Sequence, residues 1–339
     1  MDQEKKLVDE VSGWLRVYDD GSVDRTWTGP PELKFMTESV PPHDQFIEGV
    51  ATRDVVIDSN SGLTVRIYMP DQIPANKTKL PIILHFPGGG FCICQADWCM
   101  YYHMYTRVAR SVPAICVSVF LRLAPENRLP AACDDGYAAL LWLRSLAKGE
   151  SNEPWLNDHA DFNRVFLIGD SSGGNIVHQV AARGGHLGLS PLRLAGGVPI
   201  HPGFVRKERS QSELEQPESP FLTLDMLDKF LALALPLGST KDHPITCPMG
   251  PAAPPLNGLD LPPFLLCVAE KDMIKDTEIE YYEAMRKANK DVELLISPGM
   301  GHSFYLNKNA VGMDPNTAAQ TAAQTTALID GIKEFINKH

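Results

Sequence analysis

Short apolar runs recur along most of the chain and alternate with stretches in which apolar residues are spaced three or four apart. Runs rich in Val, Ile, Leu and Phe and bounded by Gly, Pro or polar clusters are typical of buried strands. The pattern predicts eight strands, at residues 54–58, 63–68, 80–86, 114–120, 164–168, 194–200, 264–269 and 292–297.

Helical spacing fills most of the intervals between these strands. It predicts helices at residues 98–111, 134–147, 276–289 and 317–337, and another that begins after residue 171. The first two strands are joined by the turn at 59–62 and form a hairpin, whereas the later strands alternate with helices. Such alternation implies right-handed crossovers, so the predicted fold class is α/β, an eight-stranded and mostly parallel sheet with helices on both faces.

Two segments depart from this alternation. Residues 1–45 precede the sheet; Leu7, Val8, Val11 and Leu15 have the spacing of an amphipathic helix over residues 4–15, and residues 27–42 are Pro-rich. Residues 204–258 are a charged, Pro-rich insertion around one helix at 224–235. We therefore divide the chain into an N-terminal segment, 1–45, and an α/β domain, 46–339, that contains the insertion.

Composition excludes several classes of function. The chain has 339 residues, is 44% hydrophobic and carries a net charge of −11. It shows no basic stripe of the kind that binds nucleic acid or an anionic membrane surface. The charged N-terminus leads into no apolar signal core, and no apolar run approaches the ~20 residues of a membrane span. We expect a cytoplasmic protein, either a monomer or a homodimer.

The seven cysteines do not form a recognisable metal motif. Cys92, Cys94 and Cys99 have the spacing C-x-C-x₄-C, and no second Cys or His pair completes a zinc site. An odd number of cysteines, several within apolar segments, favours buried thiols in a reducing compartment. We predict no metal and no organic cofactor.

The strand at 164–168 leads into a Gly-flanked serine and then a helix. A serine in a G-x-S-x-G sequence between a strand and a helix has its hydroxyl exposed on a sharp turn, beside free N–H groups at the helix N-terminus. Gly169 and Gly173 give this frame to Ser171; Ser172 would need a glycine where Asp170 stands. Ser171 is the predicted nucleophile.

A serine nucleophile needs a histidine base, and the base needs a carboxylate to orient it. After this kind of turn the expected order along the chain is serine, acid, histidine. Asp272 and His302 follow Ser171 in that order, each just beyond a predicted strand. Other candidates fit less well as base (His85, His178, His201) or as acid (Glu270, Asp276).

Gly88, Gly89 and Gly90 follow the strand at 80–86. Successive glycines allow a backbone to approach a ligand closely with its N–H groups directed at it. Together with the N–H of Ser172, Gly89 and Gly90 predict an oxyanion hole, with Gly88 as a further candidate donor.

Six segments together give the chain a family resemblance: residues 88–91, 122–126, 128–132, 169–175, 272–276 and 301–305. They resemble plant carboxylesterases of the hormone-sensitive-lipase-like α/β-hydrolase family, most closely the branch associated with the hypersensitive response. The resemblance implies Ser171, Asp272 and His302 as the triad, and Gly89, Gly90 and Ser172 as oxyanion donors. It also implies that residues 1–45 form a cap, and that 204–258 and this cap form a lid.

Two positions depart from that family. Pro87 replaces the histidine of the family's His-Gly-Gly-Gly sequence, and Leu121 replaces the tyrosine that usually precedes Arg122. The oxyanion donors are main-chain groups, so we expect activity to survive both changes.

The predicted function is hydrolysis of small apolar or aromatic esters, among which the methyl ester of a plant metabolite is one possibility. Related lyases of plant specialised metabolism replace the serine, and related gibberellin receptors lack the catalytic histidine; this chain keeps Ser171 and His302. An apolar, aromatic substrate pocket is predicted from Phe91, Trp98, His201, Phe204, Phe304 and Tyr305.

Overall fold

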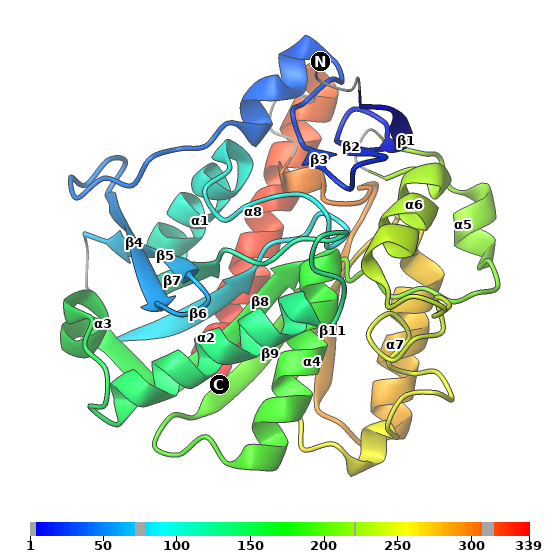
Figure 1. The fold of residues 1–339 in the computed structure, drawn as a ribbon. Helices are drawn as coiled ribbons and strands as arrows, with labels where there is room; N and C mark the ends of the chain where they lie inside the picture. Colours follow the sequence, from blue (N-terminus) through cyan, green and yellow to red (C-terminus); the bar gives the residue numbers. More distant parts are fainter. Residues whose placement is uncertain (1–4, 72–78, 220–221, 307–314) are drawn as a thin grey trace.

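A single eight-stranded sheet forms the centre of the computed structural model, which describes residues 5–71, 79–219, 222–306 and 315–339 (Figure 1). Its strand order is β11-β10-β9-β8-β6-β7-β5-β4. The strands are β4 (Val50–Asp58), β5 (Leu63–Pro70), β6 (Leu80–Phe86), β7 (Ile115–Val119), β8 (Ala160–Asp170), β9 (Leu194–Ile200), β10 (Phe264–Ala269) and β11 (Val292–Ser297).

The sheet is mostly parallel, as predicted. Strand β5 pairs antiparallel with both β4 and β7, and every other neighbouring pair is parallel. The β4–β5 pair is the predicted hairpin. In parallel sheets the strands are buried on both faces, and all seven residues of β6 are indeed buried.

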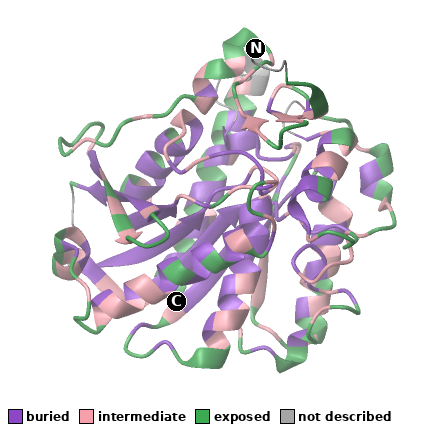
Figure 2. Cartoon of the chain, in the orientation of Figure 1, coloured by how far each residue is buried: buried purple, intermediate pink, exposed green. Residues whose placement is uncertain are grey.

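Helices cover both faces of the sheet (Figure 1). One face carries α1 (Cys99–Ser111) and α8 (Pro315–Lys338), which contact each other; the other carries α2 (Ala131–Ala147), α4 (Ser172–Leu187) and α7 (Lys275–Lys287). The short α3 (Pro154–His159), which the apolar pattern does not predict, precedes β8. Figure 2 shows the sheet and the inner sides of these helices as buried.

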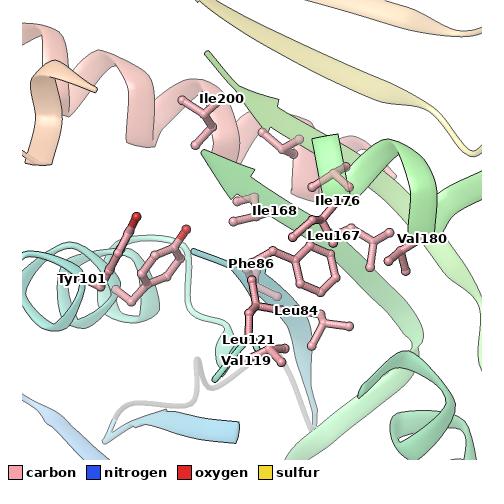
Figure 3. Close-up of a cluster of buried hydrophobic side chains, with 14 of the residues drawn as sticks. Leu84, Phe86, Tyr101, Val119, Leu121, Leu167, Ile168, Ile176, Val180 and Ile200 are labelled. Carbon is pink, nitrogen blue, oxygen red and sulfur yellow. The ribbon is translucent and has the colours of Figure 1, made fainter. Parts of the chain in front are cut away.

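A cluster of buried side chains lies where α4 packs against the central strands. Phe86, Leu167, Ile176 and Val180 meet there, and each is fully buried (Figure 3). Burying a side chain of this size contributes about 1.5–3 kcal/mol. The helix that follows Ser171 is therefore held rigidly on the sheet, which makes it a stable platform for the turn at its N-terminus.

The N-terminal segment forms a small sheet where an amphipathic helix was predicted for residues 4–15. It consists of β1 (Leu7–Val11), β2 (Leu15–Tyr18) and β3 (Val23–Asp24), paired antiparallel in that order. Gly13 lies in the turn between β1 and β2 with φ +79°, a conformation that stops a right-handed helix. The apolar spacing predicts a helix, and this prediction is wrong because the turn at Gly13 makes the segment a hairpin.

The rest of the N-terminal segment contains the 3₁₀ turn η1 (Pro31–Thr37). The insertion at 204–258 contains α5 (Gln211–Glu215), α6 (Leu224–Ala234) and the 3₁₀ turn η2 (Leu256–Gly258). A further 3₁₀ turn, η3 (Phe304–Leu306), follows β11. Helix α6 contacts β1, so the two segments meet above the carboxyl ends of the strands (Figure 1).

Most predicted boundaries agree with the structure to within four residues. Helix α2 begins at Ala131 instead of 134, and β8 begins at Ala160 instead of 164. Among the helices of the described ranges, we find none that is both long enough and apolar enough to cross a bilayer.

Candidate active site

Ser171 lies at the sharp turn between β8 and α4. Its backbone has φ 51° and ψ −123°, in a region that residues other than glycine rarely adopt. The flanking glycines are required by close packing: a Cβ on Gly169 would lie 2.3 Å from the Gly173 carbonyl oxygen, and one on Gly173 would lie 2.0 Å from the Phe86 oxygen. This is the geometry expected of a nucleophile elbow.

Asp272 and His302 come from the loops that follow β10 and β11. These strands are parallel neighbours in register from Phe264–Val292 to Ala269–Ser297, so their carboxyl ends meet at one edge. The Nδ1 of His302 lies 2.7 Å from Oδ2 of Asp272, and the other Asp272 oxygen accepts a hydrogen bond from the N–H of Ile274 (3.1 Å). Both side chains are buried.

Burial and mutual attraction shift the pKa values of His302 and Asp272 in opposite directions. Burial lowers the pKa of His302, but the charge of Asp272 and its hydrogen bond outweigh burial, so this pKa lies above its ordinary 6.5. Burial raises the pKa of Asp272, and His302 more than compensates, so this pKa lies below its usual range. An ionised Asp272 thus stabilises the protonated form of the His302 ring relative to its neutral form.

Asp276, the competing candidate for the acid, has a different partner. Its Oδ2 accepts a hydrogen bond from the N–H of Ser212 (2.7 Å), which ties the first turn of α7 to α5. Glu270 accepts from the N–H of Gly299 (2.6 Å) and lies at the surface. The structure brings Asp272, and neither of these two, to His302.

His201 supports the loop that carries His302. Its Nδ1 accepts a hydrogen bond from the N–H of Ser303 (3.0 Å), and burial lowers the pKa of His201 to about 4. The ring is therefore neutral at physiological pH and acts as an acceptor. Among the other histidines, His178 pairs with Tyr281 on α7 (2.9 Å), and His85 is buried within β6.

Gly89, Gly90 and Ser172 line one cavity with Ser171 and His302. Within the described part of the chain, the main-chain N–H groups of Gly89, Gly90 and Ser172 have no hydrogen-bond acceptor. Gly89 and Gly90 have φ +95° and +59°, and a Cβ on Gly90 would lie 2.5 Å from the Phe230 ring. Three free N–H groups beside a half-buried serine are the elements of an oxyanion hole.

The hydroxyl of Ser172 has a contact that sequence reasoning missed. It accepts a hydrogen bond from the N–H of Phe91 (3.1 Å), directly after the glycine triplet. Ser172 therefore contributes its side chain to this region as well as its main-chain N–H. The neighbouring Gly88 donates its own N–H to the Tyr101 hydroxyl (2.9 Å), so that group is already bonded.

The cavity at Ser171 has a volume of about 70 Å³. Its roof comes from the two segments outside the α/β alternation: Trp14 from the turn after β1, and side chains from α6 and the stretch before it. No Lys or Arg is found among the described residues that line it. The roof residues missed by sequence reasoning are Trp14, Leu222, Leu227, Phe230 and Leu231.

Only one of the six predicted pocket residues, Phe91, lines this cavity within the described chain. Trp98 stacks on Trp14, with ring centroids 6.4 Å apart, and so lies one layer behind the wall. Phe204 is fully buried against Tyr281, with ring centroids 4.5 Å apart. His201 lies beneath the His302 loop, as described above.

Phe304 and Tyr305 line a second cavity, of about 360 Å³, between η1, α1 and α8. They were predicted as part of the aromatic wall beside Ser171, but in η3 (Phe304–Leu306) they line this second cavity and not the one at Ser171. The prediction of these pocket walls is corrected by the structure, because position after a strand end does not determine the direction of a side chain in a loop.

The cluster His201, Asp272 and His302 offers three possible ligand atoms within 4.8 Å of one another. However, the 2.7 Å between His302 Nδ1 and Asp272 Oδ2 is a hydrogen-bond distance. Two ligands of a tetrahedral zinc ion would be about 3.3 Å apart, given metal–ligand distances near 2.0–2.1 Å. This arrangement fits a proton shared between the side chains better than a metal ion.

Comparison with known proteins places this geometry in a family. Residues 83–306 match the family model described as alpha/beta hydrolase fold. The chain is 36% identical over 304 residues to probable carboxylesterase 6 of Arabidopsis thaliana, with 88% of this chain and 85% of that protein covered.

Two other plant relatives carry different names. The chain is 36% identical over 311 residues to 2-hydroxyisoflavanone dehydratase of Glycyrrhiza echinata, covering 89% of this chain and 91% of that protein. It is 35% identical over 288 residues to gibberellin receptor GID1C of Arabidopsis thaliana, covering 81% of each.

The fold, the strand-end site and these similarities agree with the resemblance seen in the motifs. The chain belongs to the alpha/beta hydrolase family, in its carboxylesterase-like, hormone-sensitive-lipase-like plant group.

Proposed function

We propose that the chain is a serine carboxylic-ester hydrolase that works through an acyl-enzyme. Ser171 is the nucleophile, His302 the general base and Asp272 the acid that orients it. The observation that carries this proposal is the 2.7 Å hydrogen bond from His302 to Asp272, with the His302 ring and the elbow serine lining one cavity. Relatives named as carboxylesterases support it.

In the proposed reaction, Ser171 Oγ attacks the ester carbonyl carbon and His302 takes the hydroxyl proton. The carbonyl oxygen becomes an oxyanion, which accepts hydrogen bonds from the N–H groups of Gly89, Gly90 and Ser172. Collapse of the intermediate breaks the carbon–oxygen bond, and His302 returns its proton to the leaving alcohol. Water then attacks the acyl-enzyme, with His302 again taking the proton and the same N–H groups binding the oxyanion, and the carboxylic acid is released.

The cavity favours a small, uncharged ester. Its wall is largely apolar, and no described Lys or Arg lines it that could hold a substrate carboxylate. Small-acyl aryl esters such as nitrophenyl acetate and butyrate suit this wall, and so does the methyl ester of an apolar plant metabolite.

We further propose that residues 1–45 act as a cap and 204–258 as a lid of the catalytic domain, 46–339. Trp14 from the first segment and Phe230 from the second both line the cavity at Ser171, which supports a shared roof. Removal of either segment is expected to expose Ser171 to solvent.

A fluorophosphonate probe with intact-mass readout tests the proposal. We expect one probe per chain, mapped to Ser171 by peptide fragmentation, and loss of both labelling and ester hydrolysis in Ser171→Ala. The esterase loss should be at least ~10³-fold, as for removal of a nucleophile from other triads. Full activity in Ser171→Ala, or labelling at another serine, would contradict the proposal.

A lyase reaction is the second candidate, because one relative is named as a dehydratase. Product mass separates the two reactions: hydrolysis adds one water to the substrate, and dehydration removes one. The cytoplasmic location and the monomer or homodimer stay predictions, to be checked by a fluorescent fusion and by sedimentation.

A further inference from the structure

We propose that two side chains, Tyr101 and Ser172, hold the glycine loop in register with the nucleophile, and that they are positioning residues of the reaction. The loop, residues 87–91, is anchored at each end to a neighbour of Ser171. Its first anchor runs through Tyr101 to Asp170, and its second is the Ser172 hydroxyl. This inference rests on the proposed hydrolase function.

The first anchor begins at Gly88. Its N–H donates to the hydroxyl of Tyr101 (2.9 Å), and that hydroxyl donates to Oδ2 of Asp170 (3.0 Å). The contact is tight, since a Cβ on Gly88 would lie 2.5 Å from the same carboxylate oxygen. Tyr101 and Asp170 are both buried, so water is excluded from competing for these bonds.

Asp170 is itself held from behind. Its other oxygen lies 3.5 Å from Nε2 of His85, whose Nδ1 lies 2.7 Å from the hydroxyl of Ser118 on β7. His85 and Ser118 are fully buried. The position of the Asp170 carboxylate is thus fixed by side chains from β6 and β7 as well as by the place of Asp170 next to Ser171.

The second anchor is at the far end of the loop. The N–H of Phe91 donates to Ser172 Oγ (3.1 Å), and both residues are buried. Serine at position 172 thus supplies an acceptor that alanine could not. The main-chain N–H of the same residue remains available for the oxyanion.

Gly89 and Gly90 lie between the two anchors. The carbonyl oxygens of Gly89 and Phe91 accept main-chain hydrogen bonds, but Pro87 has no N–H to donate and Gly89–Gly90 have no side chains. Among the described residues, the hydrogen bonds donated by the loop are therefore those of the two anchors. Oxyanion donors must be held to within about 0.5 Å of their working geometry, and a misplacement of 1 Å can cost about 10²-fold in rate. Loss of an anchor should therefore weaken binding of the transition state more than binding of the substrate.

Tyr101→Phe removes the hydroxyl that joins Gly88 to Asp170 and keeps the ring. We expect kcat for nitrophenyl acetate to fall about 10- to 100-fold with KM changed less than about 3-fold. The affinity for an aryl trifluoromethyl ketone should fall by the same factor as kcat/KM, since its adduct with Ser171 carries the oxyanion. If the hydrogen bond only stabilised the fold, its loss would lower the melting temperature and leave kcat, KM and the ketone affinity unchanged.

Tyr102→Phe is the matched control. Tyr102 is the next residue on α1, and its hydroxyl contacts His43 Nε2 (2.9 Å), away from the glycine loop. Its loss should leave kcat and the ketone affinity within about 2-fold of the unmodified chain.

Ser172→Ala tests the second anchor. It also provides an independent test of the proposal if Tyr101→Phe folds poorly. We expect a kcat loss of about 10-fold with KM retained. The double variant should lose less than the product of the two single losses, because one loop is released by either change.

The outcomes separate the two proposals. An unmodified chain that neither hydrolyses esters nor reacts with the ketone overturns the hydrolase function. An active chain in which Tyr101→Phe and Ser172→Ala keep kcat and ketone affinity, or lose only thermal stability, overturns the anchoring role alone.

Discussion

Three residues from distant parts of the chain meet at the carboxyl edge of the sheet, and each is held there by a local device. Ser171 is raised by a turn with φ 51° between two closely packed glycines. Asp272 is oriented by the N–H of Ile274, and His302 by Asp272 itself. His201 steadies the residue after His302. The chemistry therefore depends on contacts made at single atoms.

The assignment of the acid leads to a first prediction. Asp272→Asn should lower kcat/KM by about 10³–10⁴-fold, because it removes the charge that stabilises the His302 imidazolium and fixes its tautomer. Asp276→Asn should cost less than about 10-fold, since Asp276 bonds to the N–H of Ser212 instead. Steady-state kinetics on one nitrophenyl ester compare the two; the opposite order would reassign the acid to Asp276.

The pH profile gives a second prediction. His302 acts as a base only when neutral, so kcat/KM should rise with pH through an apparent pKa above 6.5 and then level off. The charge of Asp272 is what raises this pKa against burial. In Asp272→Asn the residual activity should therefore titrate at lower pH. A profile that is flat from pH 5 to 9 would remove His302 from the role of base.

Among the secondary-structure elements, the roof of the cavity depends on α6 and on the small N-terminal sheet. Arg25, just after β3, donates to the carbonyl oxygens of Cys92 (2.7 Å) and Ala124 (2.9 Å), and forms two bonds to Glu126. These bonds pin the N-terminal sheet beside the glycine loop. The N-terminal sheet is thus attached at a defined point, and Trp14 from the turn after β1 lines the cavity.

Helix α6 is expected to limit the size of the acyl group. Phe230 packs directly over Gly90. Phe230→Ala should open the cavity and raise the ratio of octanoate to acetate hydrolysis by about 10-fold or more, since each methylene accommodated is worth about 1–3 kcal/mol. A panel of nitrophenyl esters of increasing chain length measures this ratio.

Leu233→Ala provides the control on the same helix. Leu233 is buried but does not line the cavity. The Leu233→Ala variant should have a free energy of unfolding lower by about 2–5 kcal/mol, with no change in chain-length preference. If both variants shift the chain-length preference equally, the Phe230 ring does not set the limit on acyl size. The shift then comes from loosening of α6 as a whole.

At the scale of the whole molecule, helix α7 carries a buried acid that the proposed mechanism does not use. Glu278 on α7 is fully buried, and neither carboxyl oxygen has a hydrogen-bond partner among the described residues. Burial, and then the charge of Asp272, raise the pKa of Glu278 well above its ordinary value. Folding keeps this group protonated, which allows Asp272 to carry its charge alone.

A stability prediction follows from linkage. Above the ordinary glutamate pKa of about 4.3 the unfolded chain releases the Glu278 proton while the folded chain keeps it, so folding is progressively disfavoured as pH rises. Glu278→Gln removes this effect. Its gain in stability should grow from pH 5 to pH 8, by up to about 1.4 kcal/mol per pH unit, until the pKa of the folded state is reached.

Denaturant unfolding at several pH values measures this difference. Glu283→Gln, at an exposed position of the same helix, should show no such trend. A Glu278→Gln variant that is less stable by the same amount at every pH would show that the carboxyl makes a structural contact instead.

The hydrophobic pattern by itself determined the number of strands in the large sheet, their positions along the chain and most of the helices, because burial on both faces leaves a local apolar signature. The sequence also placed Ser171 within its glycines, since the elbow is a local conformation. It could not determine that residues 7–18 form a hairpin, because apolar residues at 7, 8, 11 and 15 satisfy helical spacing until Gly13 adopts positive φ.

Tertiary structure alone decided what surrounds the serine. The 2.7 Å contact of Asp272 with His302 depends on the register of β10 and β11, and the roof depends on Trp14 and Phe230 meeting across about two hundred residues of chain. Loop conformation turned Phe304 and Tyr305 toward a different cavity. Such contacts join residues far apart in sequence, so no local pattern of polarity records them.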